Sequence, residues 1–278
     1  MKKVFYSAGL ALLLTGSIVS CKKAPADDAN ANALTQAEKN LIVSAGFNGN
    51  WAEKTADGSY LIEGDILLTT AQLQELVGVV PNELIVANEE HFRTTNVVSV
   101  PGSGQRTITV RLGSGFPSYY STGLDQALAR YNNLNLRIHF QRVTSGGNIV
   151  ISGANLGTSG GGCILGQASG FPTASGNPSS GFTLSTSSCA TAYINTANKA
   201  DEVMAHEIGH CIGFRHTDYM NRSSCGQNSN EGSAGVGAIQ IPGTPGTVTG
   251  TYNSWMMACT NNNPAFSAAD GTALNYVY

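Results

Sequence analysis

Three histidines and a glutamate stand at a spacing that could bind a metal ion and use it. His206 and His210 are four residues apart, so on a helix their imidazoles lie one above the other and can reach one ion. Glu207 would lie beside that ion, close enough to take a proton from water without binding the metal. Gly213 would end the helix in the left-handed conformation, and the turn would return His216 as a third ligand.

Three neutral imidazoles leave one tetrahedral position of a zinc ion open, which is typical of catalytic rather than structural sites. Water at that position has its pKa lowered to about 7, and Glu207 could take its proton and pass it to a leaving amine. We therefore expect peptide-bond hydrolysis with one Zn²⁺ ion, while calcium sites cannot be read from the sequence. The alternative is that these histidines are hydrogen-bonded residues of a core helix, but the six fixed identities of HExxHxxGxxH argue against it.

The segment from His206 to His216 resembles the zinc signature of the metzincin metallopeptidases, and its letters HEIGH resemble the bacterial dual-action HEIGH metallopeptidase family. Metzincins carry a methionine turn beneath the metal, and residues 254–258 are similar to it, with Met256 as the turn residue. Ordinary core packing of these residues is the alternative. Astacins, one metzincin branch, have a tyrosine where this chain has Ala258, which leaves Tyr252 as a candidate transition-state stabiliser.

The resemblance implies an α+β, metzincin-like fold in residues 96–278. A twisted mixed sheet with a backing helix and the zinc helix would be followed by an irregular C-terminal subdomain that ends in a helix. An edge strand of such a sheet could bind an extended peptide through its free backbone groups.

Residues 35–95 hold no cluster of metal ligands and are predicted to form a prosegment. The Gly64-Asp65 pair resembles one in astacin propeptides, whose aspartate occupies the open position of the zinc. The resemblance implies that Asp65 blocks the metal in a latent zymogen, and a plain turn between two strand halves is the alternative. A cysteine that covers the metal is excluded there, because no cysteine lies between Cys21 and Cys163.

The N-terminus predicts export. Two lysines and an apolar run from Ala8 to Val19 indicate a signal peptide over residues 1–20, too short to span a bilayer. It ends before Cys21 in a sequence that resembles a bacterial lipobox, so Cys21 is the expected lipid anchor and residues 21–34 a tether. The protein would then be an extracytoplasmic lipoprotein at a membrane or cell surface, or a secreted protein if the signal is an ordinary one.

Outside the cytoplasm disulfides are allowed, and five cysteines remain after Cys21. Cys163 and Cys189 flank a glycine-rich loop and form a candidate disulfide. Of Cys211, Cys225 and Cys259, one should be unpaired, and the sequence does not say which. A structural zinc held by cysteines is the alternative, although the spacings fit no such pattern.

The elements that must position the site follow from hydrophobic periodicity and capping signals. Asp201–Ile212 is the expected zinc helix, capped by Asn198. Asp218 is a candidate acceptor for the second nitrogen of a ligand histidine, and a plain turn residue is the equal alternative. The remaining expected elements are an amphipathic helix at 124–131, strands at 107–112, 134–143, 147–152 and 191–196, a substrate-cleft loop at 157–181 and a capped C-terminal helix from Ser267.

Composition narrows the class of protein further. The net charge is −3, only 12% of the 278 residues are charged, and no basic stripe indicates a nucleic-acid partner. The favoured function is an exported zinc endopeptidase that acts on peptides or proteins, expected to be a monomer. The alternatives are a non-catalytic peptide-binding surface lipoprotein on a metzincin scaffold and a metal-scavenging surface protein, against which Glu207 and the open metal position argue.

Overall fold

The chain is described here from a computed structural model that covers residues 33–77, 91–232, 236–244, 253–260 and 265–278. The predicted signal peptide, Cys21, most of the predicted tether and Tyr252 lie outside these residues. Among the described residues no helix combines the length and apolar character needed to cross a bilayer.

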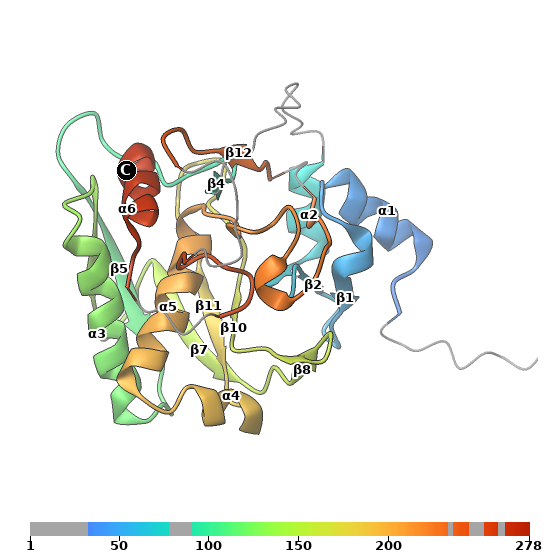
Figure 1. Cartoon of the computed structure of the whole chain (residues 1–278), viewed down its shortest axis with the longest axis horizontal. Coiled ribbons are helices and arrows are strands. Elements are labelled where there is room, and N and C mark those ends of the chain that lie inside the picture. The colour runs from blue at the N-terminus through green and yellow to red at the C-terminus, as the bar shows by residue number, and fades with distance from the viewer. Residues whose placement is uncertain (1–32, 78–90, 233–235, 245–252, 261–264) are drawn as a thin grey trace, which may run out of the picture. The chain divides into compact units, whose positions relative to one another are not determined.

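An eight-stranded mixed sheet organises the fold, in the order β1-β2-β3-β10-β11-β7-β5-β6 (Figure 1). Strands β11, β7, β5 and β6 run parallel, while β10 runs antiparallel to β11. The predicted α+β class with a mixed sheet is thereby confirmed. The strands are β1 (Ala52–Lys54), β2 (Tyr60–Ile62), β3 (Ile66–Leu68), β5 (Arg106–Leu112), β6 (Ile138–Arg142), β7 (Ile149–Ala154), β10 (Gly166–Ala168) and β11 (Gly181–Ser185).

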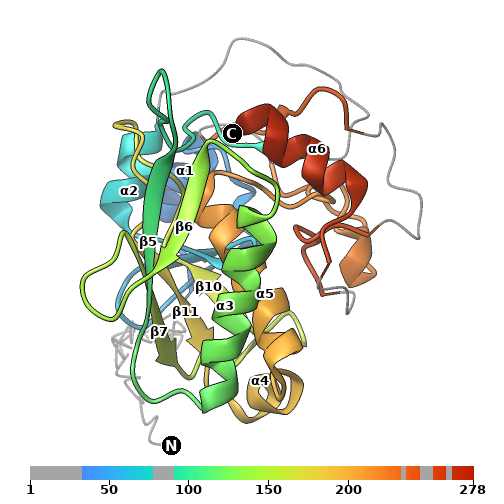
Figure 2. The same cartoon turned by 90° about the vertical axis from the view of Figure 1, so that its left-hand side faces the viewer.

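Two long helices, α3 (Ser118–Asn132) and α5 (Ala197–Ile212), pack together against the sheet (Figure 2). They approach closely because Gly123 of α3 faces Ala200 of α5, where a Cβ on the glycine would lie 2.6 Å from the alanine Cβ. The main hydrophobic core lies between these helices and the strands, and it includes Ile108, Leu124 and Ile208.

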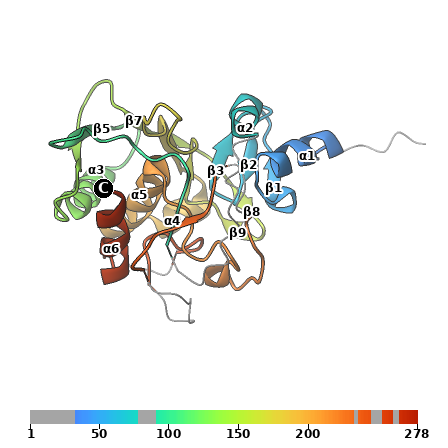
Figure 3. The same ribbon diagram turned by 90° about the horizontal axis from the view of Figure 1, so that it is seen from above.

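The N-terminal region, which we define as residues 33–77, forms one end of the sheet (Figure 3). Its strands β1, β2 and β3 are antiparallel neighbours, and its helices α1 (Gln36–Ser44) and α2 (Thr70–Leu76) both begin with capping boxes. The region has a separate small core, to which Val236 contributes from the C-terminal half. Strand β3 pairs with β10 in parallel at Ile66 and Ala168, so the N-terminal region extends the sheet of the rest of the chain.

The remaining described chain, residues 91–278, is called the catalytic body below. Its outlying elements are β4 (Phe92–Arg93), β8 (Thr158–Ser159), β9 (Gly162–Cys163), β12 (Ile239–Gln240), α4 (Ser188–Tyr193), α6 (Ala268–Val277) and the short 3-10 helix η2 (Ser223–Cys225). The N-terminal region contains a second short 3-10 helix, η1 (Gly49–Trp51). The predicted C-terminal helix is present as α6, with Ser267 and Asp270 as its capping box.

Three local expectations from the sequence were wrong. Residues 191–196, expected as a strand, lie in and after helix α4, because Ser187 caps that helix by accepting from the Ala190 N–H. Helix α5 is capped by Thr196 rather than Asn198, which lies in its first turn. The region 157–181, expected as a long loop, contains the hairpin β8–β9 and the strand β10.

Candidate active site

Helix α5 carries the first two histidines and the glutamate of the motif. The helix ends at Gly213, whose φ of 109° is left-handed and whose N–H bonds back to the carbonyls of Gly209 and His210. The turn then brings His216 beside the first two histidines, with ring centroids 4.8 to 5.3 Å apart among the three. The three histidines that the sequence predicts as ligands are thus brought together.

Each of the three imidazoles has its Nδ1 bonded to an oxygen that can only accept. His206 donates to the Trp255 carbonyl (2.8 Å), His210 to the Phe214 carbonyl (2.8 Å) and His216 to the Glu231 carboxylate (2.9 Å). These partners place the proton on Nδ1 when the ring is neutral, which leaves the Nε2 lone pair free for a metal.

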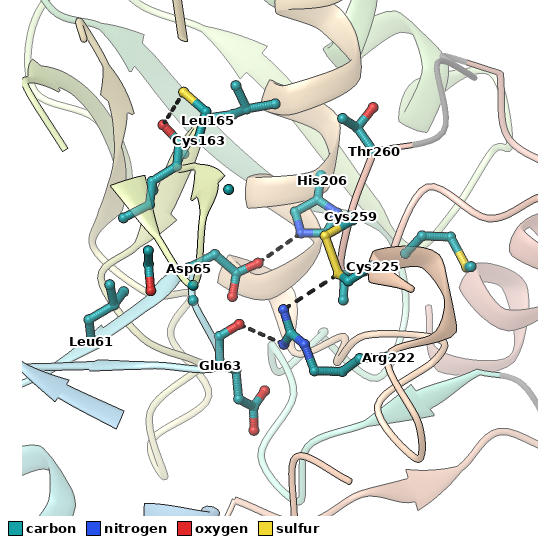
Figure 4. Close-up of a pocket in the computed structure, with 18 of the residues that line it drawn as sticks. Leu61, Glu63, Asp65, Cys163, Leu165, His206, Arg222, Cys225, Cys259 and Thr260 are labelled. Carbon is teal, nitrogen blue, oxygen red and sulfur yellow. Dashed lines mark hydrogen bonds and ion pairs between the residues drawn. A yellow bond between two sulfur atoms is a disulfide. The ribbon is translucent and has the colours of Figure 1, made fainter. Parts of the chain in front are cut away.

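The three Nε2 atoms surround one oxygen of Asp65. The distances from Asp65 Oδ2 are 3.2 Å to His206, 3.3 Å to His210 and 2.7 Å to His216. Figure 4 shows the contact between Asp65 and His206. The four ligand atoms lie within 4.8 Å of one another, as a single divalent ion requires. Three neutral nitrogens and a carboxylate form a donor set that suits tetrahedral zinc, so the residues present fit this ion.

The electrostatics of the cluster agree with a shared ligand position. Burial would raise the pKa of Asp65, but His216 and His210 hold it well below its usual range. Burial lowers the pKa of His210 to about 4, despite Asp65 nearby. Burial lowers the pKa of His216, but the carboxylates of Asp65 and Glu231 outweigh burial and raise this pKa well above its ordinary value.

Glu207 is buried on the neighbouring face of α5, against strand β10. A Cβ at Gly166 would lie 2.3 Å from Glu207 Oε1, so this carboxylate fits only because residue 166 is a glycine. Its other oxygen, Oε2, has no hydrogen-bond partner among the described residues. Burial, and next the charge of Asp65, raise the pKa of Glu207 well above its ordinary value.

The predicted methionine turn lies directly behind the helix. Met256 is buried, and its carbonyl accepts from the N–H of Thr217, the residue after the third histidine. A Cβ at Gly209 would lie 2.3 Å from Met256 Sδ and 2.9 Å from Trp255 Nε1. The glycine of the HEIGH letters is therefore required because the methionine turn packs against the helix backbone.

Glu231 is a functional candidate that the sequence analysis missed. It accepts from His216 Nδ1 and also from the Arg222 guanidinium, and it is fully buried. Asp218, the candidate for this role in the sequence, instead accepts from Ser224 and from the Ala258 N–H, so the first of its two interpretations was wrong. One signal was available, because Glu231 is the only acidic residue between Asp218 and Asp270.

A cavity of about 600 Å³ opens beside this cluster, between the N-terminal region and the catalytic body. Its lining includes Asp65, His206 and Glu207, and the glycine-rich segment 159–166 forms one wall, within the region expected to rim the cleft. Disulfides Cys163–Cys189 and Cys225–Cys259 brace two of its walls, and Cys211 is free and buried in the core. Of the other histidines, His91 is buried and bonded to Asp270, and neither it nor His139 is in the cluster.

An α+β fold with two histidines on one helix, a third after its turn and a glutamate beside the first is the arrangement of a zinc-dependent hydrolase. Residues 60–278 match the family described as dual-action HEIGH metallo-peptidase, and the chain belongs to this family of metallopeptidases. The predicted family is thereby confirmed, and the family match begins within the N-terminal region, before Asp65.

Comparison with curated proteins finds no match. Among solved structures, one of myroilysin is 19% identical, covers 67% of this chain and 98% of its own, and has a TM-score of 0.39. A second myroilysin structure is 17% identical over 72% of this chain and 94% of its own, with a TM-score of 0.37. High choriolytic enzyme 1, a hatching enzyme zinc-protease from Oryzias latipes (Medaka fish), is 18% identical over 65% of this chain and 93% of its own, also with a TM-score of 0.37.

Proposed function

We propose that the chain is an exported zinc endopeptidase that is made as a latent precursor. The observation that carries this proposal is the meeting of three Nε2 atoms at one carboxylate oxygen, with a buried glutamate beside them. A protein that only bound peptides would gain nothing from a positioned base, so Glu207 favours the enzyme over the non-catalytic alternative.

In this proposal His206, His210 and His216 hold the zinc ion through their Nε2 atoms. Zinc, when bound there, supplies the Lewis acid that activates water and polarises the scissile carbonyl. Glu207 takes the proton of the attacking water as general base and delivers it to the leaving amine as general acid. In the latent chain its pKa is raised by burial and by Asp65. The departure of Asp65 removes one of these two causes and so favours the ionised base.

The N-terminal region is the proposed inhibitor of the site. Asp65 occupies the position shared by the three imidazoles, and its own carbonyl accepts from the Ala168 N–H of β10 at 2.6 Å. Strand β3 covers the edge of β10, where an extended substrate would otherwise add by main-chain hydrogen bonds. The same hairpin thus covers both the metal position and the strand edge.

We propose that the boundary between prosegment and catalytic domain lies before His91, and not at residues 95/96 as expected from the sequence. Phe92 and Arg93 pair with β12, the Thr94 N–H donates to the Gly213 carbonyl at 2.8 Å, and the Phe92 carbonyl accepts from the Arg215 N–H at 2.9 Å. These contacts tie the segment after His91 to the end of the zinc helix, so a cut at 95/96 would remove part of the site's support.

The proposed location is outside the cytoplasm, with a lipid on Cys21 as the anchor. Two disulfides in the described chain support an oxidising compartment. Cleavage before Cys21 and lipid attachment would appear in the mass of the mature N-terminal peptide, and a mature chain that retains residues 1–20 would contradict this part of the proposal.

Casein digestion by the full-length Asp65→Ala chain tests the function. We expect digestion with zinc supplied, loss of digestion after zinc is removed by a chelator, and recovery when zinc is added back. Tight binding of one zinc ion without digestion of casein or gelatin would instead favour the peptide-binding alternative.

A further inference from the structure

Glu63, two residues before Asp65, is bound by the catalytic body through both its side chain and its backbone. Its carboxylate forms an ion pair with Arg215, whose side chain is completely buried. Its carbonyl accepts from Nη1 of Arg222 at 2.8 Å, a contact seen at the cavity wall in Figure 4. One acidic residue therefore fills two arginine contacts beside the metal ligands.

Two arginines and two glutamates meet beside the metal ligands, and their charges balance only while Glu63 is present. Arg215 and Arg222 are cations, and their acidic partners are Glu63 and Glu231. Glu231 is already engaged by Arg222 and His216, and it lies 3.9 Å from Arg215. Departure of Glu63 would leave the two arginines with one carboxylate between them, and a cation that loses its carboxylate favours the binding of another anion.

The N-terminal region also supplies part of the apolar surroundings of Arg215. The guanidinium lies over the ring of Phe47, with 5.9 Å to the centroid, and over the ring of Tyr219, with 5.3 Å. Phe47 belongs to the N-terminal region and Tyr219 to the catalytic body. When the N-terminal region leaves, Arg215 keeps one aromatic face and loses its carboxylate, so its exposed face becomes a site for a new anion.

Two further observations indicate that the carboxylate of Glu63 is held for recognition rather than for the turn. Glu63 has a φ of 59°, a left-handed conformation that glycine or asparagine would adopt with less strain. The ion pair between Glu63 and Arg215 is also incomplete, because Glu63 Oε2 and Arg215 Nε have no hydrogen-bond partners among the described residues. A carboxylate that approached Arg215 at a different angle could bond to Nε as well as to Nη2.

We propose that Arg215 and Arg222 form a substrate subsite for an acidic residue, which Glu63 occupies in the latent chain. Arg215 binds the side-chain carboxylate and Arg222 binds the backbone carbonyl of the same residue. This inference rests on the proposed function, since it names the substrate class of the same site: peptides with a glutamate or aspartate within about two residues of the bond that is cut. The two-residue spacing is that between Glu63 and Asp65 on the hairpin.

Binding to the full-length, zinc-loaded Glu63→Gly chain tests the subsite without catalysis. Glycine accepts the left-handed φ, so the change removes the carboxylate without adding strain. The probes are propionate, which matches the side chain removed from residue 63, and its uncharged match, propionamide. The carbonyl of residue 63 remains on Arg222, so these probes test the Arg215 contact alone. We expect propionate alone to raise the melting temperature of Glu63→Gly, or to restore folding if the variant is unfolded, and neither probe to affect the wild type. Equal effects of both probes, or equal responses of variant and wild type, would overturn the subsite.

Cleavage by the Glu63→Gly/Asp65→Ala chain tests its role in substrate choice. Pairs of fluorogenic peptides differ only by glutamate or glutamine at one position near the cut. At one such position we expect kcat/KM to be about tenfold higher or more for glutamate, because glutamine has no negative charge to replace the Glu63 carboxylate on Arg215. Equal cleavage of both members at every position refutes the subsite and leaves the peptidase intact. Selective binding of propionate without cleavage of any peptide refutes the peptidase and supports the carboxylate site.

Discussion

The catalytic body is stabilised mainly by close packing in its core, whereas the N-terminal region contacts the metal site mainly through charged side chains. The catalytic body has a large core in which glycines such as Gly123 and Gly209 allow backbone and side chains to touch. The N-terminal region has three-residue strands and a small core, and it reaches the metal site through two carboxylates, Glu63 and Asp65. No other molecule can replace side chains packed in a core, whereas another carboxylate or water can replace a carboxylate at the metal site. The N-terminal region therefore contacts the metal site as an exchangeable ligand does.

The largest effect is expected within the catalytic body, at Glu207. In the full-length Asp65→Ala chain, Glu207→Gln should lower the rate of peptide hydrolysis by about 10²- to 10⁴-fold, since the amide cannot take a proton. Zinc content, measured by atomic absorption, should remain at one ion per chain. As a control, Asp125→Asn changes an exposed carboxylate that pairs with Arg142 and should leave the rate unchanged. Equal hydrolysis with and without the Glu207 carboxylate would exclude it as the base.

The second-largest effect is expected in the N-terminal region, where Asp65 occupies the metal position. Asp65→Ala should raise casein hydrolysis by the full-length chain about tenfold to a hundredfold, because a competing ligand leaves the metal position. The matched control is Asp57→Asn, in the same region but in the turn between β1 and β2, where Asp57 accepts from Thr55 and Ser59. If wild type and Asp65→Ala digest casein at equal, measurable rates, Asp65 is a turn residue and not the inhibitor.

A pair of glycines compares the packing of the two regions. Gly209→Ala pushes a methyl group against Met256 and Trp255 and should lower the free energy of unfolding by about 1–3 kcal/mol. Gly58→Ala meets no atom within 4 Å, and its φ of 85° should lower the free energy of unfolding by only about 1 kcal/mol. Urea denaturation of both variants measures the difference. A larger loss at Gly58 would show that the catalytic body is not the more tightly packed of the two.

Features that depend on residues a few positions apart could be predicted from the sequence. His206, Glu207 and His210 are set by helix geometry over one turn, so their convergence followed from spacing alone. The start of α6 and the αL residue Gly213 were also readable, because capping depends on residues within a few positions. Strand 191–196 failed because the cap at Ser187 outweighs the strand tendency of threonine and isoleucine.

Long-range partners could not be read in this way. Glu231 meets His216 after a segment rich in glycine, serine and asparagine that has no hydrophobic period, and Arg215 meets Glu63 across 152 positions. Neither contact leaves a local pattern, since each depends on the path of the whole chain. The scarcity of charge in residues 219–253 was the available signal, because a lone carboxylate or arginine in such a segment needs a buried partner.

The smallest effect is a proton released when zinc enters the metal-free chain. Burial lowers the pKa of His216, but Asp65 and Glu231 overcome it and hold the pKa well above the ordinary value, so the metal-free ring carries a proton near neutral pH. Burial holds His210 neutral there, with a pKa of about 4, so it has no proton to lose. Zinc binds only the neutral ring, so zinc affinity should rise with pH, by up to about tenfold per unit for one proton.

Titration calorimetry of wild-type chain in two buffers of different ionisation enthalpy would count the protons released. Glu231→Gln removes one of the two carboxylates that keep His216 charged, one from each region, so this variant should release fewer protons than wild type at the same pH. Asp65→Ala removes the other and should act in the same direction. If only Glu231→Gln changes the count, then Asp65 does not contact the histidine in solution and the two regions are less closely joined than their ion pairs indicate.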